Sequence, residues 1–343
     1  QTHYYQPGFT MVGGGFMTLK SNTRKEEDLI HPDTVWIHDR VKKFDPKRNA
    51  VKLSNGDEVT YDYMILATGV QLRWDMVKGL PEALDTPGVC SNYSPFHCEK
   101  TFKELNSVTS GNCVFTFPKT PIKCAGAPQK VCYYGEQIVR DRGYRKHTHF
   151  IYATSLNRLF GVEAYLSALN KVAREKEIEV RTRHNLIEVD ADRKIAKFEL
   201  LDESCQPNGE FDEIPSKNFP NIFAAGDCMN TPNAKTAAAV SSHLKTVGKN
   251  LRAVLEGREP PARYDGYASC PLIIDKRRAI LAEFSPQGRM ETTPLDQSIP
   301  RHHPFLMKRY LMPFLYWRFL VKGRWNGPAT IRKILHLGFV PKK

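Results

Sequence analysis

Cys124 stands in a loop rich in proline and glycine, within FTFPKTPIKCAGAPQKVCYYGEQ at residues 115–137. An apolar run typical of a strand precedes this loop, and a segment typical of a helix follows it. A thiol at the start of a helix faces unpaired backbone N–H groups and the positive end of the helix dipole, which lower its pKa and favour the nucleophilic thiolate. Cys124 is therefore a candidate nucleophile, although a lone cysteine in a turn is more often a small packing residue.

Cys270 has similar surroundings. It lies in YDGYASCPLIIDKRRAILAEF at residues 264–284, where it precedes a proline and an apolar run at the edge of a predicted strand. Cys124 and Cys270 can react as a pair only if the fold brings them together, which their spacing cannot show. The eight cysteines of the chain include no CxxC motif, which argues against a disulfide scaffold and a zinc ribbon. His97 and Cys98 lack a second ligand pair, so no metal site is predicted.

Two strand-to-turn junctions have glycines that would let the backbone approach a phosphate or a sugar closely. They are ATGV at 67–70, with Gly69, and NIFAAGDC at 221–228, with Asp227. Either motif alone is weak evidence, and an ordinary turn aspartate is the alternative for Asp227. Together, in one α/β chain, they resemble the two late FAD-contact motifs of flavoproteins with two dinucleotide-binding domains.

The segment KTAAAV at 235–240 reads as the start of a helix. Free N–H groups there would stabilise the negative charge that builds on one edge of a reduced flavin, and the small alanines would let the ring lie close. A plain buried helix start is the alternative. By contrast, MVGGGFMT at 11–18 is no dinucleotide fingerprint, because the third glycine of G-x-G-x-x-G would fall on Thr18. A turn or a close helix contact is predicted there.

The candidate residues need an α/β framework to position them. Residues 111–190 alternate strand, helix, strand, helix, strand, which indicates a parallel α/β layer. Residues 50–69 predict a hairpin around an Asn-Gly-Asp turn followed by a buried strand, and 189–202 predict a second hairpin. From 218 onward an apolar strand enters the Gly-Asp turn and leads to a long alanine-rich helix.

Composition sets the wider limits. With 343 residues, 41% of them hydrophobic, and a mean hydropathy of -0.46, the chain predicts a globular protein of about two or three domains. The net charge of +13 is mostly scattered, which is typical of a solvated face, although nucleic acid, an anionic membrane surface or anionic ligands would also suit it. There is no secretory signal and no apolar span of membrane-crossing length.

Several motifs together carry a resemblance to one family. The motifs HYYQP, TPIKCAGAPQK, GDC, KTAAAV, YDGYASCPL, ILAEF and LMPFLYW resemble the eukaryotic, mitochondrial type of sulfide:quinone oxidoreductase, from residue 1 to about 340. The resemblance implies an α/β flavoprotein of the disulfide-reductase type, with two dinucleotide-binding domains and a C-terminal membrane-associating region. The implied domains are 1–105 for the first part of the FAD-binding domain, 106–210 for an NAD(P)-like Rossmann domain, 211–262 for the second FAD-binding part and 263–343 for the C-terminal domain.

The resemblance also implies a mechanism. Cys124 and Cys270 would be the redox cysteines, bridged at rest through a sulfane sulfur that hydrogen sulfide attacks to leave a persulfide. Two electrons would pass through FAD to ubiquinone, and the sulfur to glutathione or sulfite, at the inner mitochondrial membrane. Flavin is the cofactor that can exchange electrons between thiolates and a quinone. The resemblance implies FAD binding by Gln6, Val41, Asp227, Ala237, Ala238, Ala239 and Val240. We add Gly69 and Lys235 to these cofactor-binding residues.

The sequence departs from the family pattern in two places. The family begins with a strand and a G-x-G-x-x-G loop for the FAD pyrophosphate, and this chain opens on QTHYYQPGF, just after that unit. Between Asp202 and NFPNIF the family carries an extra strand and a proline-rich loop, whereas here only ESCQPNGEFDEIPSK bridges the gap. A truncated, non-catalytic product that cannot hold FAD is therefore one alternative. An NADH:quinone oxidoreductase is another, although YATSLNRLFGVEAY lacks its nicotinamide-binding glycines.

The tail, RHHPFLMKRYLMPFLYWRFLVKGRWNGPATIRKILHLGFVPKK, interleaves aromatic residues with lysine and arginine. Its apolar run at 305–321 is interrupted by Lys308, Arg309, Pro313 and Arg318, so it cannot span a bilayer. Helices lying in the membrane interface would suit this composition, with the aromatic face in lipid and the basic face on anionic headgroups. A helix pair packed on the protein body is the alternative. No nucleic-acid module precedes the tail, so no nucleic-acid partner is predicted.

Overall fold

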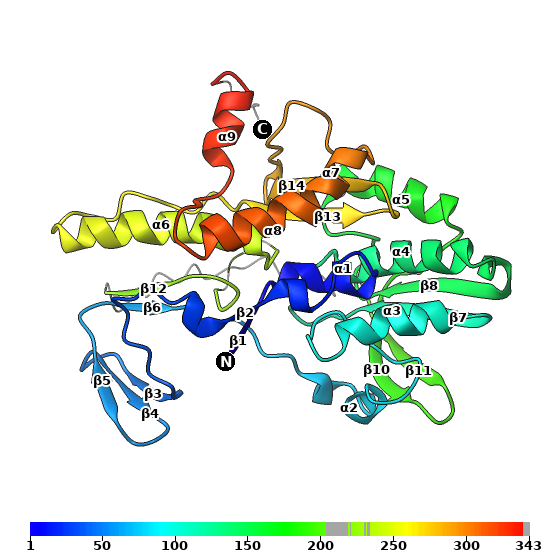
Figure 1. The fold of residues 1–343 in the computed structure, drawn as a ribbon, viewed down its shortest axis with the longest axis horizontal. Coiled ribbons are helices and arrows are strands. Elements are labelled where there is room, and N and C mark those ends of the chain that lie inside the picture. The colour runs from blue at the N-terminus through cyan, green and yellow to red at the C-terminus, as the bar shows by residue number, and fades with distance from the viewer. Residues whose placement is uncertain (204–218, 220, 230, 232–233, 339–343) are drawn as a thin grey trace.

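A parallel sheet of strand order β7-β8-β9 lies at one end of the molecule (Figure 1). The structure is a computed structural model, and it describes residues 1–203, 219, 221–229, 231 and 234–338. The central strand β8 is almost entirely buried because it has a neighbour on each side. The alternation predicted from the sequence is confirmed. Its elements are β7 (Gly111–Phe117), α4 (Ala127–Asp141), β8 (Thr148–Thr154), α5 (Leu166–Glu175) and β9 (Glu179–Arg181).

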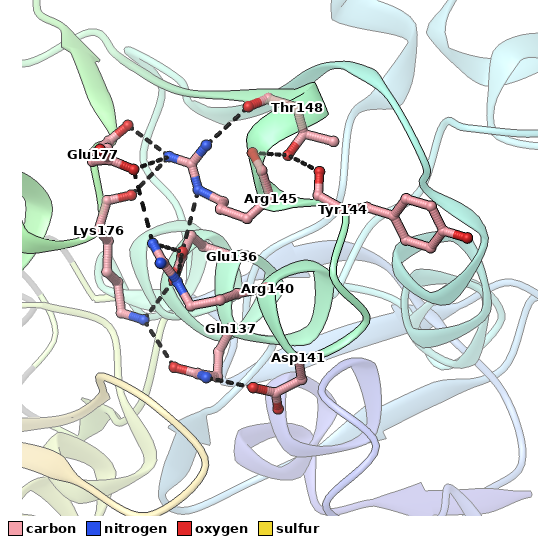
Figure 2. A network of polar contacts seen from close by, with 9 residues as sticks. All are labelled: Glu136, Gln137, Arg140, Asp141, Tyr144, Arg145, Thr148, Lys176 and Glu177. Atoms are coloured by element: carbon pink, nitrogen blue, oxygen red, sulfur yellow. Dashed lines mark hydrogen bonds and ion pairs between the residues drawn. The ribbon is translucent and has the colours of Figure 1, made fainter.

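Helix α4 is held near its C-terminal end by a buried carboxylate, drawn in Figure 2. Glu136 is fully buried and binds three cations: Arg140 at 2.6 Å and Arg145 at 3.2 Å to Oε1, and Lys176 Nζ at 2.7 Å to Oε2. A buried charge is tolerated only when such partners surround it. The network joins α4 to the segments that follow it, and so fixes the helix whose first turn follows Cys124.

The two glycine turns meet at one edge of a second parallel pair. Strand β6 (Met64–Leu66) pairs with β12 (Ile222–Ala224), so both turns leave the carboxyl ends of adjacent strands. The expected burial of β6 is wrong, because within the described part of the chain it pairs with β12 alone and Ile65 remains 48% exposed. Helix α6 (Ala237–Leu255) begins after β12, and the Thr236 hydroxyl caps it by accepting from the Ala239 amide at 3.2 Å.

Cys270 lies on the edge strand of a buried antiparallel sheet. Strand β13 (Ala268–Ile273) pairs with β14 (Ala279–Ser285), which pairs with β15 (Gly288–Arg289). All residues of β13 and β14 are buried. Strand β13 packs against α4 and α6, and helix α7 (His302–Leu306) packs on β14. The apolar runs of the sequence on either side of a short charged turn therefore form the core strands.

Smaller elements complete the fold. Helix α1 packs on α3. A Cβ at Gly13, at the end of α1, would lie 1.9 Å from Asn92 Oδ1, so the glycine run makes the close contact that was predicted.

Three features of the sequence lie outside the described residues: Cys205, the predicted domain boundary at 210 and nearly all of ESCQPNGEFDEIPSK. Both predicted hairpins form, β4-β5 and β10-β11. The remaining elements are β1 (Thr2–Tyr4), α1 (Phe9–Gly13), β2 (Thr23–Lys25), β3 (Val41–Asp45), β4 (Ala50–Leu53), β5 (Glu58–Thr60), α2 (Leu80–Ala83), α3 (Cys98–Ser107), β10 (His184–Asp190) and β11 (Ile195–Leu200).

The tail forms a continuous helical run with two π-helical segments, followed by a short helix. Lys308 is only 3% exposed and its ammonium donates to the Pro7 carbonyl at 3.2 Å, so the prediction that the basic residues face headgroups is wrong for this lysine. None of the helices described is both long and apolar enough to cross a membrane. The tail comprises α7 (His302–Leu306), η7 (Met307–Leu311), α8 (Met312–Leu315), η8 (Tyr316–Leu320) and α9 (Ala329–Leu335).

Candidate active site

The fold brings the two candidate cysteines together. Cys124 lies in the loop before α4 and Cys270 in β13, and their Sγ atoms are 3.4 Å apart. This separation is well beyond the ~2.05 Å of a disulfide bond, so the structure holds two thiols. Cys270 is buried and Cys124 half-buried. No group of three or more histidine, cysteine, aspartate or glutamate side chains in the described ranges could hold a metal ion.

The backbone ties Cys124 to the start of α6. Its amide donates to the Lys235 carbonyl at 2.8 Å, and its own carbonyl accepts from the Ala127 amide at the start of α4. Cys124 has a φ of 48°, in the left-handed region that non-glycine residues seldom adopt. This conformation is held by hydrogen bonds on both sides of the residue, and it places one thiol between two helix starts.

Gly126 makes room for the second thiol. A Cβ built on this residue would lie 2.5 Å from Cys270 Sγ and 2.5 Å from Leu272 Cδ2. The φ of Gly126 is -86°, which any residue can adopt, so the requirement for glycine is one of space. The missing side chain thus lets β13 approach the Cys124 loop closely enough for the sulfurs to touch.

Two buried lysines act on the sulfur pair, Lys130 by contact and Lys308 through its charge, and neither was predicted from the sequence as a site residue. Lys130 Nζ lies 3.2 Å from Cys124 Sγ and 3.7 Å from Cys270 Sγ, and its side chain is 1% exposed. Burial alone would lower the pKa of Lys130, but the two sulfurs outweigh burial and raise it. Burial and the charge of Lys130 lower the pKa of Lys308 to about 7. Lys130 could have been found from its position on the otherwise apolar face of α4, one turn from Ala127 and Tyr134.

The pair is electrostatically asymmetric. The hydrogen bond from the Cys270 thiol, together with the charges of Lys130 and Lys308, lowers the pKa of Cys124 well below its usual range although burial opposes this. The hydrogen bond to Cys124, burial and the charge on Cys124 raise the pKa of Cys270. The low pKa of Cys124 that the sequence led us to expect therefore has a different main cause, a neighbouring thiol and two ammonium groups.

Most of the predicted cofactor residues gather beside Cys124. Gln6 Oε1 accepts from Lys123 Nζ at 2.7 Å, and Lys123 forms a β-bridge with Lys235. Lys235 Nζ donates to the carbonyl of Asp227 at 2.7 Å. Ala237 to Val240 form the first turn of α6. The structure therefore places one edge of the predicted flavin site next to the sulfur pair.

Two predicted cofactor residues lie elsewhere. Val41 begins β3 and is 45% exposed, in a sheet at the opposite end of the molecule from β7–β9 (Figure 1). Gly69 follows β6 with a φ of 69°, and no atom would lie within 4 Å of a Cβ placed there. The structure does not bring Val41 to the thiols, whereas the Gly69 turn leaves the same sheet edge as the Asp227 turn.

The residues near α6 suit a flavin. Burial raises the pKa of Asp227 although Lys235 and Lys123 oppose it, and within the described ranges its carboxylate has no hydrogen-bond or ion-pair partner. A half-buried carboxylate without a partner fits a ligand hydroxyl. Thr236 caps only the Ala239 amide, and the other amides in the first turn of α6 fit an electron-rich ring edge. Asp227, Lys235 and the first turn of α6 would hold such a group, which would accept two electrons beside the thiols.

Comparison with known proteins gives the family. No family model matches the chain. It is 39% identical to the mitochondrial sulfide:quinone oxidoreductase of Mus musculus, over 98% of this chain and 82% of that protein. It is 35% identical to the protein of the same name from Dictyostelium discoideum, over 96% and 80%. The X-ray structure of the Aquifex aeolicus sulfide:quinone oxidoreductase has the same fold, with a TM-score of 0.74, 15% identity, and coverage of 99% of this chain and 88% of that one. The family implies a flavin cofactor, and by its sequence this chain belongs to the mitochondrial sulfide:quinone oxidoreductases.

Proposed function

We propose that the chain oxidises hydrogen sulfide at Cys124 and Cys270, transfers two electrons through FAD to ubiquinone, and passes the sulfur to a small acceptor, glutathione or sulfite. The observation that carries this proposal is the pair of thiols 3.4 Å apart, facing a buried lysine and hydrogen-bonded through the backbone to the segment that opens α6. A dithiol next to a flavin site is the arrangement needed to move electrons from sulfur to a cofactor. The curated relatives from Mus musculus and Dictyostelium discoideum are named sulfide:quinone oxidoreductases, which supports sulfide as the electron donor and a quinone as the acceptor.

The sulfur spacing supports a bridged resting form. The outer atoms of a three-sulfur bridge with bonds of ~2.05 Å lie roughly 3.3 Å apart, close to the 3.4 Å between Cys124 and Cys270. When hydrosulfide attacks one cysteine sulfur, a new S–S bond forms and the bond to the bridging sulfur breaks. The electron pair of the broken bond stays on the bridging sulfur, which leaves a persulfide on each cysteine, one of them an anion.

Lys130 is placed to stabilise that anion on either side, because its ammonium lies within 3.7 Å of both sulfurs. Once the small acceptor has removed the outer sulfur of one persulfide, that cysteine is left as a thiolate, and its attack on the remaining persulfide re-forms the three-sulfur bridge with loss of two electrons. A bound flavin would accept those two electrons. We take the flavin to be FAD because the glycine turns at Gly69 and Asp227 and the distant Val41 would suit a long dinucleotide. The buried cations also favour an anionic sulfur acceptor.

The absorption spectrum of the purified chain, recorded before and after anaerobic addition of sulfide, tests the proposal. We expect flavin bands that bleach when sulfide is added and return when a quinone is added. A colourless protein that stays colourless with added FAD would instead support the truncated, non-catalytic alternative. Bleaching by NADH but not by sulfide would support the NADH:quinone alternative.

We also propose peripheral association of the tail with the inner mitochondrial membrane. The tail has many large apolar side chains that are 36–86% exposed to solvent. A surface that faces only water normally has fewer exposed apolar side chains in one segment. A quinone dissolved in the membrane has to be collected there. These side chains are Leu306, Tyr310, Leu311, Phe314, Phe319, Ile331, Ile334, Leu335 and Leu337.

The double substitution Leu311→Glu with Phe314→Glu is expected to lower binding to vesicles of anionic phospholipid by at least about tenfold, because charges would be inserted where apolar surface enters lipid. Vesicle flotation measures this. The matched control is Phe96→Glu, since Phe96 is 84% exposed but lies in the loop before α3. Equal flotation of the double variant and the wild type would contradict the assignment of the tail.

A further inference from the structure

His243 is a buried histidine, and only one of its two ring nitrogens has a hydrogen-bond partner among the described residues. It lies in α6 and is 4% exposed. Its Nδ1 is 3.1 Å from the amide nitrogen of Gly226. Because an amide can only donate, Nδ1 carries the lone pair and the ring proton is on Nε2. Within the part of the chain described, Nε2 is buried without a hydrogen-bond partner.

The hydrogen bond fixes the turn that carries Asp227. Gly226 has a φ of 84°, a conformation that glycine adopts readily but does not prefer. The amide of the preceding residue, Ala225, donates to the Leu66 carbonyl at 2.9 Å. The carbonyl of Gly226 itself accepts from the Met229 amide at 3.2 Å. Without the imidazole, the amide that directly precedes Asp227 would lose its acceptor, and the turn would be free to rotate.

The imidazole is itself held from the other side. The ring of Tyr264 packs edge-on against it, with centroids 4.3 Å apart. The Tyr264 hydroxyl donates to the Tyr267 carbonyl, three residues before Cys270. His243 therefore lies between the turn that carries Asp227 and the segment that leads into β13.

We propose that His243 is a positioning residue for the flavin: as the neutral Nε2–H tautomer it accepts the Gly226 amide and so orients the Asp227 carboxylate toward the cofactor. The proposal rests on the flavin site of the proposed function. It assigns His243 no contact with sulfide or quinone. Its loss is expected to weaken flavin binding before it changes the chemistry at the thiols.

The surroundings of His243 keep it neutral. Burial and the positive charge of Lys235 lower the pKa of His243 to about 4, while Asp265 opposes this. Protonation would place a proton on Nδ1 against the Gly226 N–H and break the hydrogen bond. Flavin binding through this turn is therefore expected to be complete at neutral pH and to weaken as the pH falls toward 4, where protonation of Asp227, whose pKa burial raises, adds to the effect of His243.

The experiment compares His243→Asn with His243→Phe. An asparagine Oδ1 can take the place of Nδ1 as acceptor, whereas phenylalanine fills the space without accepting. The dissociation constant of FAD, measured by fluorescence titration of the apoprotein at neutral pH, is expected to rise about tenfold in the Phe variant and to stay within about threefold of wild type in the Asn variant. Release of FAD on acidification toward pH 4 is expected in the wild type and weakened in the Asn variant, which has no imidazole to protonate.

Thermal melts of the apoproteins separate this effect from misfolding. A Phe variant that melts like the wild type and binds FAD equally well would overturn the proposal. An Asn variant that binds as weakly as the Phe variant, or releases FAD with the wild-type pH profile, would overturn it as well, and this second test holds even if the Phe variant does not fold. Failure of the wild type to bind FAD at all would refute the proposed function, and this inference with it.

Discussion

Replacing Cys124 or Cys270 with serine is expected to abolish sulfide-driven quinone reduction, by about 10³-fold or more. A hydroxyl can neither form the sulfur bridge nor carry a persulfide, so the loss affects the chemical step itself. Because the two sulfurs are in contact, either substitution removes the pair. The measurement is the rate of quinone-analogue reduction with sulfide as the electron donor.

The flavin spectrum and one matched variant distinguish loss of the reactive thiol from loss of the cofactor or of the fold. Each serine variant is expected to retain bound flavin, since neither thiol is needed to hold the cofactor. Cys90→Ser is the matched control, because Cys90 is half-buried like Cys124 but lies in the segment before α3, and it should turn over like the wild type. Turnover near the wild-type rate in the Cys124 or Cys270 variant would refute the assigned mechanism.

Gly126→Ala is expected to lower turnover about 100-fold and to cost roughly 1–3 kcal/mol of stability, because the methyl group also overpacks Leu272. The added methyl group would lie 2.5 Å from Cys270 Sγ, and a thiol at the end of a side chain moves more easily than the backbone. The expected response is thus a displaced thiol, and a misplacement of about 1 Å at a reacting atom costs roughly 10²-fold. Turnover is measured together with mass-spectrometric detection of the Cys124–Cys270 bridge, which should be absent or much reduced.

Gly248→Ala provides the control for the chemical change alone. Gly248 lies within α6, and no atom would be within 4 Å of a Cβ at this position. Alanine in a helix interior is favoured over glycine by up to about 1 kcal/mol, so this variant should be slightly more stable and fully active. If Gly126→Ala kept both the bridge and wild-type turnover, Gly126 would have no role in seating Cys270.

The sequence predicted the elements that local patterns define. The alternation over residues 111–190 appears as β7, α4, β8, α5 and β9, because the spacing of apolar residues reflects the burial of each element. The pairing of Cys124 with Cys270 lay beyond such patterns, since it depends on how β13 packs against α4.

The lysines of the site were harder to predict for a different reason. A lysine on a helix usually marks a solvated face, but Lys130 and Lys308 are turned inward, and only the three-dimensional structure shows that two sulfurs occupy the space they face. The space requirement at Gly126 was equally hidden, because its backbone conformation is ordinary and the contact comes from another strand.

The separation of the two thiols along the chain also bears on how the protein folds. Contacts that close a loop of 146 residues form late, because the chain must lose much conformational entropy before they are made. Until β13 docks, Cys124 lacks the neighbouring thiol, and until the tail docks it lacks the second ammonium that lowers its pKa. A chain that folds from its N-terminus therefore carries an ordinary, weakly reactive thiol through most of its synthesis, and the reactive thiolate arises only when the last segments are in place.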